Sequence, residues 1–176
     1  MTPWNIDPHH TALEFAVHHN GITAVRGRFL LLSGTVDTDE TGTFHGVRVS
    51  IDANSLSTNF EVRDQHLKSP EFFDTAQFPT LEFESRQVTA QGGNRFSVVG
   101  DLSMHGVTGP VTLDVQTSTA VVDLIGLTRI GASGSGRLSR QAWGITWNRL
   151  LESGGVVLAD EISIILNVEA LRPALA

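Results

Sequence analysis

The fold class is decided by the stretch Leu13-Glu14-Phe15-Ala16-Val17-His18, in which apolar and polar side chains alternate. A period of two is typical of a strand with one face in a core and the other in solvent. Similar runs follow at residues 25–32, 35–37, 47–52, 81–85, 96–102, 111–115, 131–138 and 162–168. Turn signals such as Asn20-Gly21, Ser33-Gly34 and Asp39–Gly42 are expected to separate the first strands. The pattern indicates an all-β antiparallel sandwich or barrel.

One segment, at about residues 57–74, loses this alternation. Thr58 or Asn59 is expected to cap a short helix that runs through Lys68, and Pro70 is expected to open another helical turn. A long excursion of this kind in an all-β chain is typical of a lid or a cross-barrel connection. We therefore expect roughly eight antiparallel strands with one short helical insertion, a number that can close into a barrel holding one small ligand.

The composition excludes several classes of protein. The chain has 176 residues, so a single domain over 1–176 is expected. It has no cysteine, which excludes disulfides and thiolate metal sites. A net charge of −7 argues against binding to duplex nucleic acid, which requires a basic stripe. No apolar run reaches about 18 residues, so no integral membrane segment is expected.

The start of the sequence shows no signal-peptide pattern. We therefore expect a cytoplasmic protein, or a periplasmic or secreted one if a signal peptide has been removed.

The predicted interior combines bulky and small side chains. Its inward positions are mostly Phe, Val, Leu and Ile, but Ala132, Ser133 and Gly134 stand among them. Small side chains on a strand would leave room for a ligand inside the barrel. They would equally relieve crowding at a barrel corner. The sequence leaves both interpretations open.

The seven histidines raise the question of a metal site. Neighbouring strand residues point to opposite faces, so His9-His10 and His18-His19 can each give only one ligand to a common site. On a straight strand His10 and His18 would lie about 26 Å apart. We therefore expect no built-in metal site. The nucleophile pattern G-x-S-x-G fails at Gly131–Ser135, and no glycine-rich phosphate loop is present, so no cofactor is expected.

The helical segment carries the richest group of polar side chains. Arg63, Asp64, His66 and Lys68 lie close together, and Phe72, Phe73 and Phe78 follow them. Mixed charge beside aromatic rings is typical of a pocket rim, with an apolar body inside and polar groups for a head group. A solvated helix face above a phenylalanine-anchored core would show the same pattern.

Several blocks of the sequence together resemble one known family. They are Asp7-Pro8-His9-His10-Thr11, Val25-Arg26-Gly27-Arg28-Phe29, Arg63-Asp64-x-His66-Leu67-x-Ser69-Pro70-x-Phe72-Phe73-Asp74, Gly100-Asp101-Leu102 with Gly106-Val107-Thr108, and Trp143-Gly144-Ile145-Thr146-Trp147-Asn148. In this order the blocks are similar to those of the YceI-like family. The resemblance runs from residue 4 to about residue 172 and covers nearly the whole chain.

The resemblance implies an extended eight-stranded antiparallel β-barrel, lipocalin-like, that binds a long amphiphile inside. For relatives this amphiphile is described as a polyisoprenoid, an isoprenoid quinone-like lipid or a fatty amide. The polar site residues that the resemblance implies are His10, His19, Arg26, Arg63, Asp64, His66 and Thr108. Phe15, Phe72 and Phe73 are the expected apolar contacts.

We expect a non-catalytic protein that binds, stores or transports a long-chain isoprenoid or acyl lipid. One alternative is an enzyme that acts on such a lipid with His10, His19 or His66 as general base. Another is a stress-linked scavenger of hydrophobic compounds, including drugs. Exposed strand edges and apolar rims are compatible with a homodimer.

Overall fold

The computed structural model describes residues 2–30 and 32–173. Its strands are β1 (Thr2–Ile6), β2 (Ala12–His19), β3 (Thr23–Phe29), β4 (Leu32–Thr38), β5 (Phe44–Asp52), β6 (Leu56–Ser57), β7 (Thr80–Gly92), β8 (Arg95–Met104), β9 (Val107–Thr117), β10 (Val121–Val122), β11 (Leu127–Ser139) and β12 (Leu158–Pro173). The helical elements are the α-helix α1 (Glu61–Lys68) and the short 3₁₀ turns η1 (Ala53–Ser55) and η2 (Arg140–Trp143). None of the helices in these described ranges is long and apolar enough to cross a membrane.

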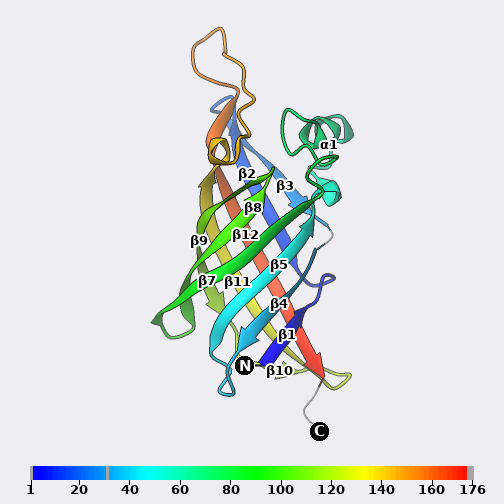
Figure 1. Cartoon of the computed structure of the whole chain (residues 1–176), viewed down its shortest axis with the longest axis vertical. Helices are drawn as coiled ribbons and strands as arrows, with labels where there is room; N and C mark the ends of the chain where they lie inside the picture. Colours follow the sequence, from blue (N-terminus) through cyan, green and yellow to red (C-terminus); the bar gives the residue numbers. More distant parts are fainter. Residues whose placement is uncertain (1, 31, 174–176) are drawn as a thin grey trace.

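The strands form one antiparallel sheet that closes on itself (Figure 1). Strand β12 pairs with β11 along one edge, and with both β1 and β2 along the other. Strands β1 and β2 therefore share one position of the barrel wall. Strand β3 pairs with β2, and β4 pairs with β1, so β3 and β4 share the next position. Strand β6 in turn pairs with β3, and β5 pairs with β4, so β5 and β6 share the position after that. The predicted eight-stranded antiparallel barrel is confirmed.

The second strand run breaks at a different place from the one expected. Ser33 and Gly34 lie inside β4, so the predicted break there is wrong. The chain instead leaves the sheet after β3, where the Leu30 amide donates to the Ser55 carbonyl oxygen at 3.3 Å. A side chain at Gly34 would collide with the carbonyl oxygen of Arg48 on β5. Glycine therefore permits close strand packing at this position and makes no turn.

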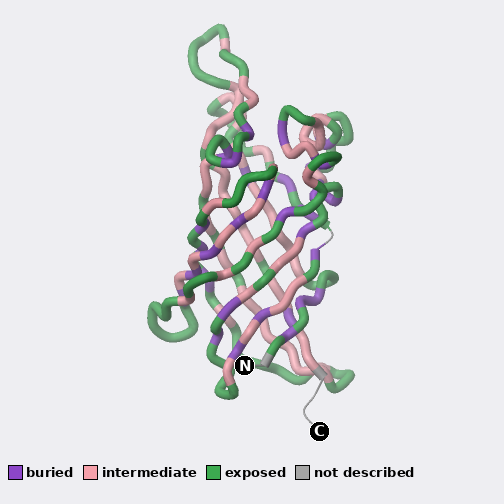
Figure 2. Tube along the Cα trace, viewed as in Figure 1, coloured by how far each residue is buried: buried purple, intermediate pink, exposed green. Residues whose placement is uncertain are grey.

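The end of the barrel away from α1 is packed by aromatic residues. Trp4 is 1% exposed, and its indole nitrogen donates to the Thr38 hydroxyl at 2.9 Å. The Arg172 guanidinium lies 4.1 Å from the Trp4 ring centroid. Phe44 and Phe96 meet edge to face with their centroids 5.6 Å apart. Figure 2 shows that the loops at both ends are exposed, whereas buried residues recur along the barrel wall.

The expected helical insertion is present as α1 and the turns that follow it. The residue preceding the first turn is Phe60, which makes no side-chain cap, so the predicted capping by Thr58 or Asn59 is wrong. The reason is that the Thr58 hydroxyl donates to Asp64, while Asn59 has left-handed backbone geometry at φ 59°. Pro70 opens hydrogen-bonded turns and no further helix.

Helix α1 is fastened through its buried residue Asp64. The Asp64 carboxylate accepts hydrogen bonds from the Thr58 amide at 2.8 Å and from the Thr58 hydroxyl. Arg63 donates to the hydroxyl and carbonyl oxygens of the same threonine at 2.7 and 3.0 Å. One threonine therefore connects two successive residues of α1 to the segment that follows β6, and this sets the position of the helix beside the barrel (Figure 1).

Candidate functional site

The barrel encloses a cavity of about 570 Å³. This volume lies within the range of roughly 300–1,000 Å³ that is typical of small-molecule sites. Inward-facing side chains of β2, β11 and β12 line it, and many of them are only partly buried although they point into the barrel. Examples are Leu13, Phe15, Ile130, Ala132, Ile164 and Leu166. The interior of the barrel is therefore partly hollow.

The small residues of β11 serve both purposes that the sequence left open. Ala132 lines the cavity, and so contributes free space. A Cβ atom at Gly134 would lie 3.0 Å from the Leu166 side chain, and one at Gly136 would lie 2.7 Å from Leu113. These two glycines accommodate neighbouring leucines and leave no room for a ligand.

Aromatic rings fill the part of the barrel nearest to α1. The Phe15 ring lies directly over the backbone of Gly27 on the adjacent strand, where any Cβ atom would collide with it. The Phe73 ring lies 6.5 Å from Phe15 and 5.8 Å from Phe29, measured between centroids. Phe73 belongs to the turns after α1, so this segment reaches into the barrel and lines the cavity.

A second aromatic group joins α1 to the segment after η2. The His66 ring lies edge to face with both Phe72 and Trp147, at centroid distances of 5.0 and 5.2 Å. The Phe72 and Trp147 rings are 5.2 Å apart, and all three residues line the cavity. The Nε2 atom of the His66 ring is hydrogen-bonded to the Glu71 carboxylate. This aromatic group covers the cavity at its α1 end.

The ionisable residues in the cavity lining are mostly basic. Arg63, His66, His19 and Arg140 line the cavity, whereas Glu14 is the acidic residue in its lining as described. Arg140 is 3% exposed, and burial lowers the pKa of its guanidinium. Arg140 was not among the site residues predicted from the sequence. The signal that could have found it is its register, because it stands two residues beyond Leu138, which faces inward on β11.

Of the predicted site residues, the structure brings six together around the cavity. These are Phe15, His19, Arg63, His66, Phe72 and Phe73. Their contact with a ligand remains a prediction. Trp147, which stands in one of the blocks that resemble the family but was not among the predicted site residues, lines the cavity with them.

The remaining four predicted residues lie elsewhere. Arg26 is exposed on β3, because it follows Val25, which faces the cavity, and successive strand residues point to opposite faces. Thr108 is exposed on β9 and shares a 2.7 Å hydrogen bond with Ser103. Asp64 belongs to α1, and its side chain is buried against Thr58. The cavity lining therefore does not support ligand contacts for these three residues.

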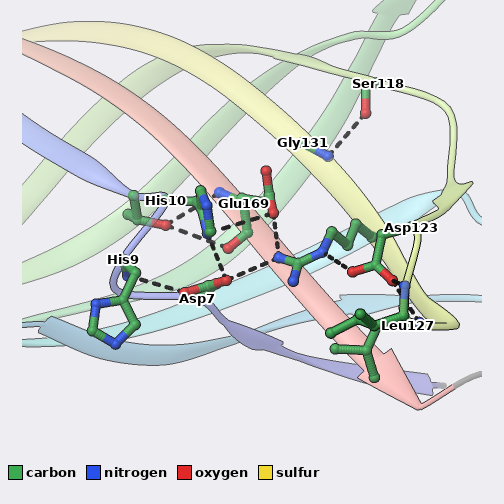
Figure 3. A network of polar contacts seen from close by, with 11 residues as sticks. Asp7, His9, His10, Ser118, Asp123, Leu127, Gly131 and Glu169 are labelled. Carbon is green, nitrogen blue, oxygen red and sulfur yellow. Dashed lines mark hydrogen bonds and ion pairs between the residues drawn. The ribbon is translucent and has the colours of Figure 1, made fainter.

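The fourth, His10, belongs to a polar cluster with Asp7 and Glu169, away from α1 (Figure 3). Its Nδ1 atom lies 2.9 Å from Asp7 Oδ2. Arg129 donates to Asp7 at 2.9 Å, to Asp123 at 2.6 Å and also to Glu169. Hydrogen bonds from His10 and Arg129 hold the pKa of Asp7 well below its usual value. The cluster ties the turn between β1 and β2 to β11 and β12.

Asp7, His10 and Glu169 offer ligand atoms within 4.8 Å of one another, a spacing that a metal ion requires. Arg129 already pairs with both of these carboxylates. These two carboxylates, together with that of Asp123, raise the pKa of Arg129 above its ordinary value. The arrangement is therefore that of an ion-paired contact between strands.

Comparison with known proteins identifies the family. The family model of the YceI-like domain matches residues 4–170. A UPF0312 protein of Staphylococcus aureus (strain N315) is 33% identical over 172 residues, which cover 96% of this chain and 97% of the relative. A UPF0312 protein of Shewanella denitrificans is 37% identical over 137 residues, covering 77% of this chain and 72% of the relative.

Solved structures show the same fold. Burkholderia cenocepacia BcnA aligns with a TM-score of 0.81 at 19% identity, covering 94% of this chain and 99% of BcnA. A domain from Saccharophagus degradans, described as polyisoprenoid binding, aligns with a TM-score of 0.70 at 19% identity, covering 97% and 98%. The match over residues 4–170 and the relative at 33% identity over nearly the whole chain show that this protein belongs to the YceI-like family.

Proposed function

We propose that this protein binds a long amphiphilic lipid inside its barrel and carries it without chemical change. The ligand would be a polyisoprenoid, an isoprenoid quinone-like lipid or a fatty-acid derivative. The observation that carries this proposal is the cavity of about 570 Å³ lined mainly by aliphatic and phenylalanine side chains. The polyisoprenoid-binding domain of similar fold from Saccharophagus degradans supports the choice of ligand class.

The apolar lining is sufficient to account for affinity. Each methylene group moved from water into the cavity contributes about 0.8 kcal/mol. About a dozen such groups would contribute roughly 10 kcal/mol before the cost of association is subtracted. The lipid tail would therefore supply most of the binding free energy, and the basic groups near α1 would fix its orientation.

The placement of His10 and His66 favours binding over catalysis, whereas His19 lines the cavity and stays a candidate base for the enzyme alternative. His10 lies in the polar cluster away from α1 and does not line the cavity. His66 lines the cavity, but its ring is packed between Phe72 and Trp147 and its nitrogen is bonded to Glu71. Such a ring serves as part of a wall, which is the role proposed for it here.

Native mass spectrometry and displacement of a fluorescent fatty-acid probe test the proposal. We expect long prenyl and acyl lipids to bind with one molecule per chain. Ala132→Trp, which fills the cavity, should abolish binding. Ala24→Trp, the same change on the exposed side of β3, should leave binding intact. The proposal fails if no lipid of the series binds the wild-type chain, or if both variants behave alike.

Turnover of a bound lipid would instead support an enzyme. Displacement of bound prenyl lipids by drug-like compounds of comparable affinity would support a scavenger.

A further inference from the structure

The guanidinium of Arg140 has an unused donor beside the cavity. Its Nε donates to the Ala159 carbonyl oxygen at 2.9 Å, and its Nη1 donates to those of Ile145 and Trp147 at 2.7 and 2.9 Å. The third nitrogen, Nη2, is buried and has no hydrogen-bond partner in the part of the chain that the structure describes. Buried polar groups are nearly always hydrogen-bonded, so an unused donor on a cavity-lining residue calls for an explanation.

The charge of this group also has no carboxylate in direct contact with it among the described residues. A guanidinium stays protonated in proteins, and buried charges are normally paired. Within the described ranges, Arg140 forms no ion pair, and Asp160 acts on it only through space. Backbone carbonyl oxygens hold the group in place but carry no net charge. An anion would satisfy both the free donor and the positive charge.

The position of Arg140 gives the cavity two different ends. Arg140 binds the carbonyl oxygen of Trp147, whose ring packs against His66, so the guanidinium belongs to the α1 end. Ala132 lies eight residues away along β11, which corresponds to about 26 Å of strand. Next to Ala132 the lining carries no charge: Ile130 and Val168 are apolar, and Thr117, which pairs with Ala132, is neutral. An amphiphile bound in this cavity would therefore place its polar group at the Arg140 end.

We propose that Arg140 Nη2 binds an anionic oxygen of the ligand head group, with the tail extending along β11 toward Ala132. The proposal rests on the proposed lipid-binding function and narrows it to lipids with an acidic head group. A carboxylate and a phosphate supply the same anionic oxygen, so the experiment includes both.

Two pairs of ligands with matched tails test this inference on the wild-type chain by calorimetry. The first pair is oleate and methyl oleate, and the second is geranylgeranyl phosphate and geranylgeraniol. One hydrogen bond between charged groups should make the acidic member bind about tenfold tighter or more. Preference within only one pair identifies the head group as carboxylate or phosphate.

Two variants assign the preference to Arg140. Arg140→Met should remove the discrimination within the pairs, whatever its effect on overall affinity. The matched control is Arg137→Met. Arg137 lies on β11 shortly before Arg140, is exposed and pairs with Glu161 at 3.1 Å. This control should keep the discrimination.

The outcomes separate this inference from the proposed function. If none of the four ligands binds, the lipid-binding function is refuted and the inference falls with it. If acidic and neutral members bind equally, or if Arg140→Met still discriminates between them, the lipid-binding function stands and the assignment of Arg140 is refuted.

Discussion

The connection between Asp64 and Thr58 should control how firmly α1 covers the cavity. Replacing Asp64 by alanine removes the acceptor of two hydrogen bonds, those from the Thr58 amide and hydroxyl. Hydrogen bonds to charged groups contribute about 1.5–3 kcal/mol each, and the two share one threonine and are not additive. We therefore expect α1 to open more easily by about 3 kcal/mol, which corresponds to a factor of roughly 100 in its opening equilibrium.

Native-state hydrogen exchange followed by mass spectrometry measures this change directly. In Asp64→Ala, amides of residues 61–68 should exchange roughly 100-fold faster, whereas amides of β8 and β9 should keep their wild-type rates. Asp64→Asn retains an acceptor oxygen and should show a smaller acceleration. Because Phe73 follows α1 and reaches into the barrel, ligand release should accelerate along with the exchange of α1.

Two results would refute this reasoning. Unchanged exchange of α1 in Asp64→Ala would show that Thr58 does not hold the helix. Equal acceleration in β8 and β9 would show that Asp64 stabilises the whole barrel and not the cover alone.

Three further predictions concern the barrel. Gly27→Ala should lower the free energy of unfolding by about 1–3 kcal/mol in urea denaturation, because its methyl group displaces the Phe15 ring; unchanged stability would contradict this. Asp7→Asn should make the free energy of unfolding fall less steeply between pH 5 and pH 2. The pKa of Asp7 is lower in the folded state than its unfolded-state value of about 4, so the ionised carboxylate stabilises the fold above pH 4. This stabilisation is lost as the pH falls toward the folded-state pKa of Asp7, and the asparagine variant has none to lose. Trp4→Phe should cost about 1–3 kcal/mol by loss of its buried hydrogen bond, and a thermal midpoint equal to wild type would exclude that contribution.

The fold could be predicted from the sequence because its main signal is local. The alternation in residues 13–18 fixes which face of β2 points inward, and Leu13, Phe15 and Val17 do line the cavity. The break at Ser33-Gly34 could not be assessed locally. Glycine is required there by the carbonyl oxygen of Arg48, a contact that exists only once β4 and β5 have paired.

The site was predicted less completely than the fold, for two physical reasons. Arg26 was predicted as a site residue because it stands in a block that resembles the family. Successive strand residues point to opposite faces, so Arg26 lies on the outer face of β3 next to inward-facing Val25. Arg140 was missed because an arginine after a strand normally points to solvent. Here the carbonyl oxygens of Ile145, Trp147 and Ala159 hold it inside, and they come from segments that a local pattern does not connect.

The position of β12 has a consequence for how the protein is made. This last strand pairs with β11 on one side and with β1 and β2 on the other, so Asn5 finds its partner at Leu171. During synthesis the wall cannot be sealed until residues 158–173 have left the ribosome. Until then β2 and β11 each present an open edge, and open edges invite pairing with other chains. The nascent chain is therefore most prone to aggregation until β12 is available for pairing, which is when assistance from a chaperone would matter most.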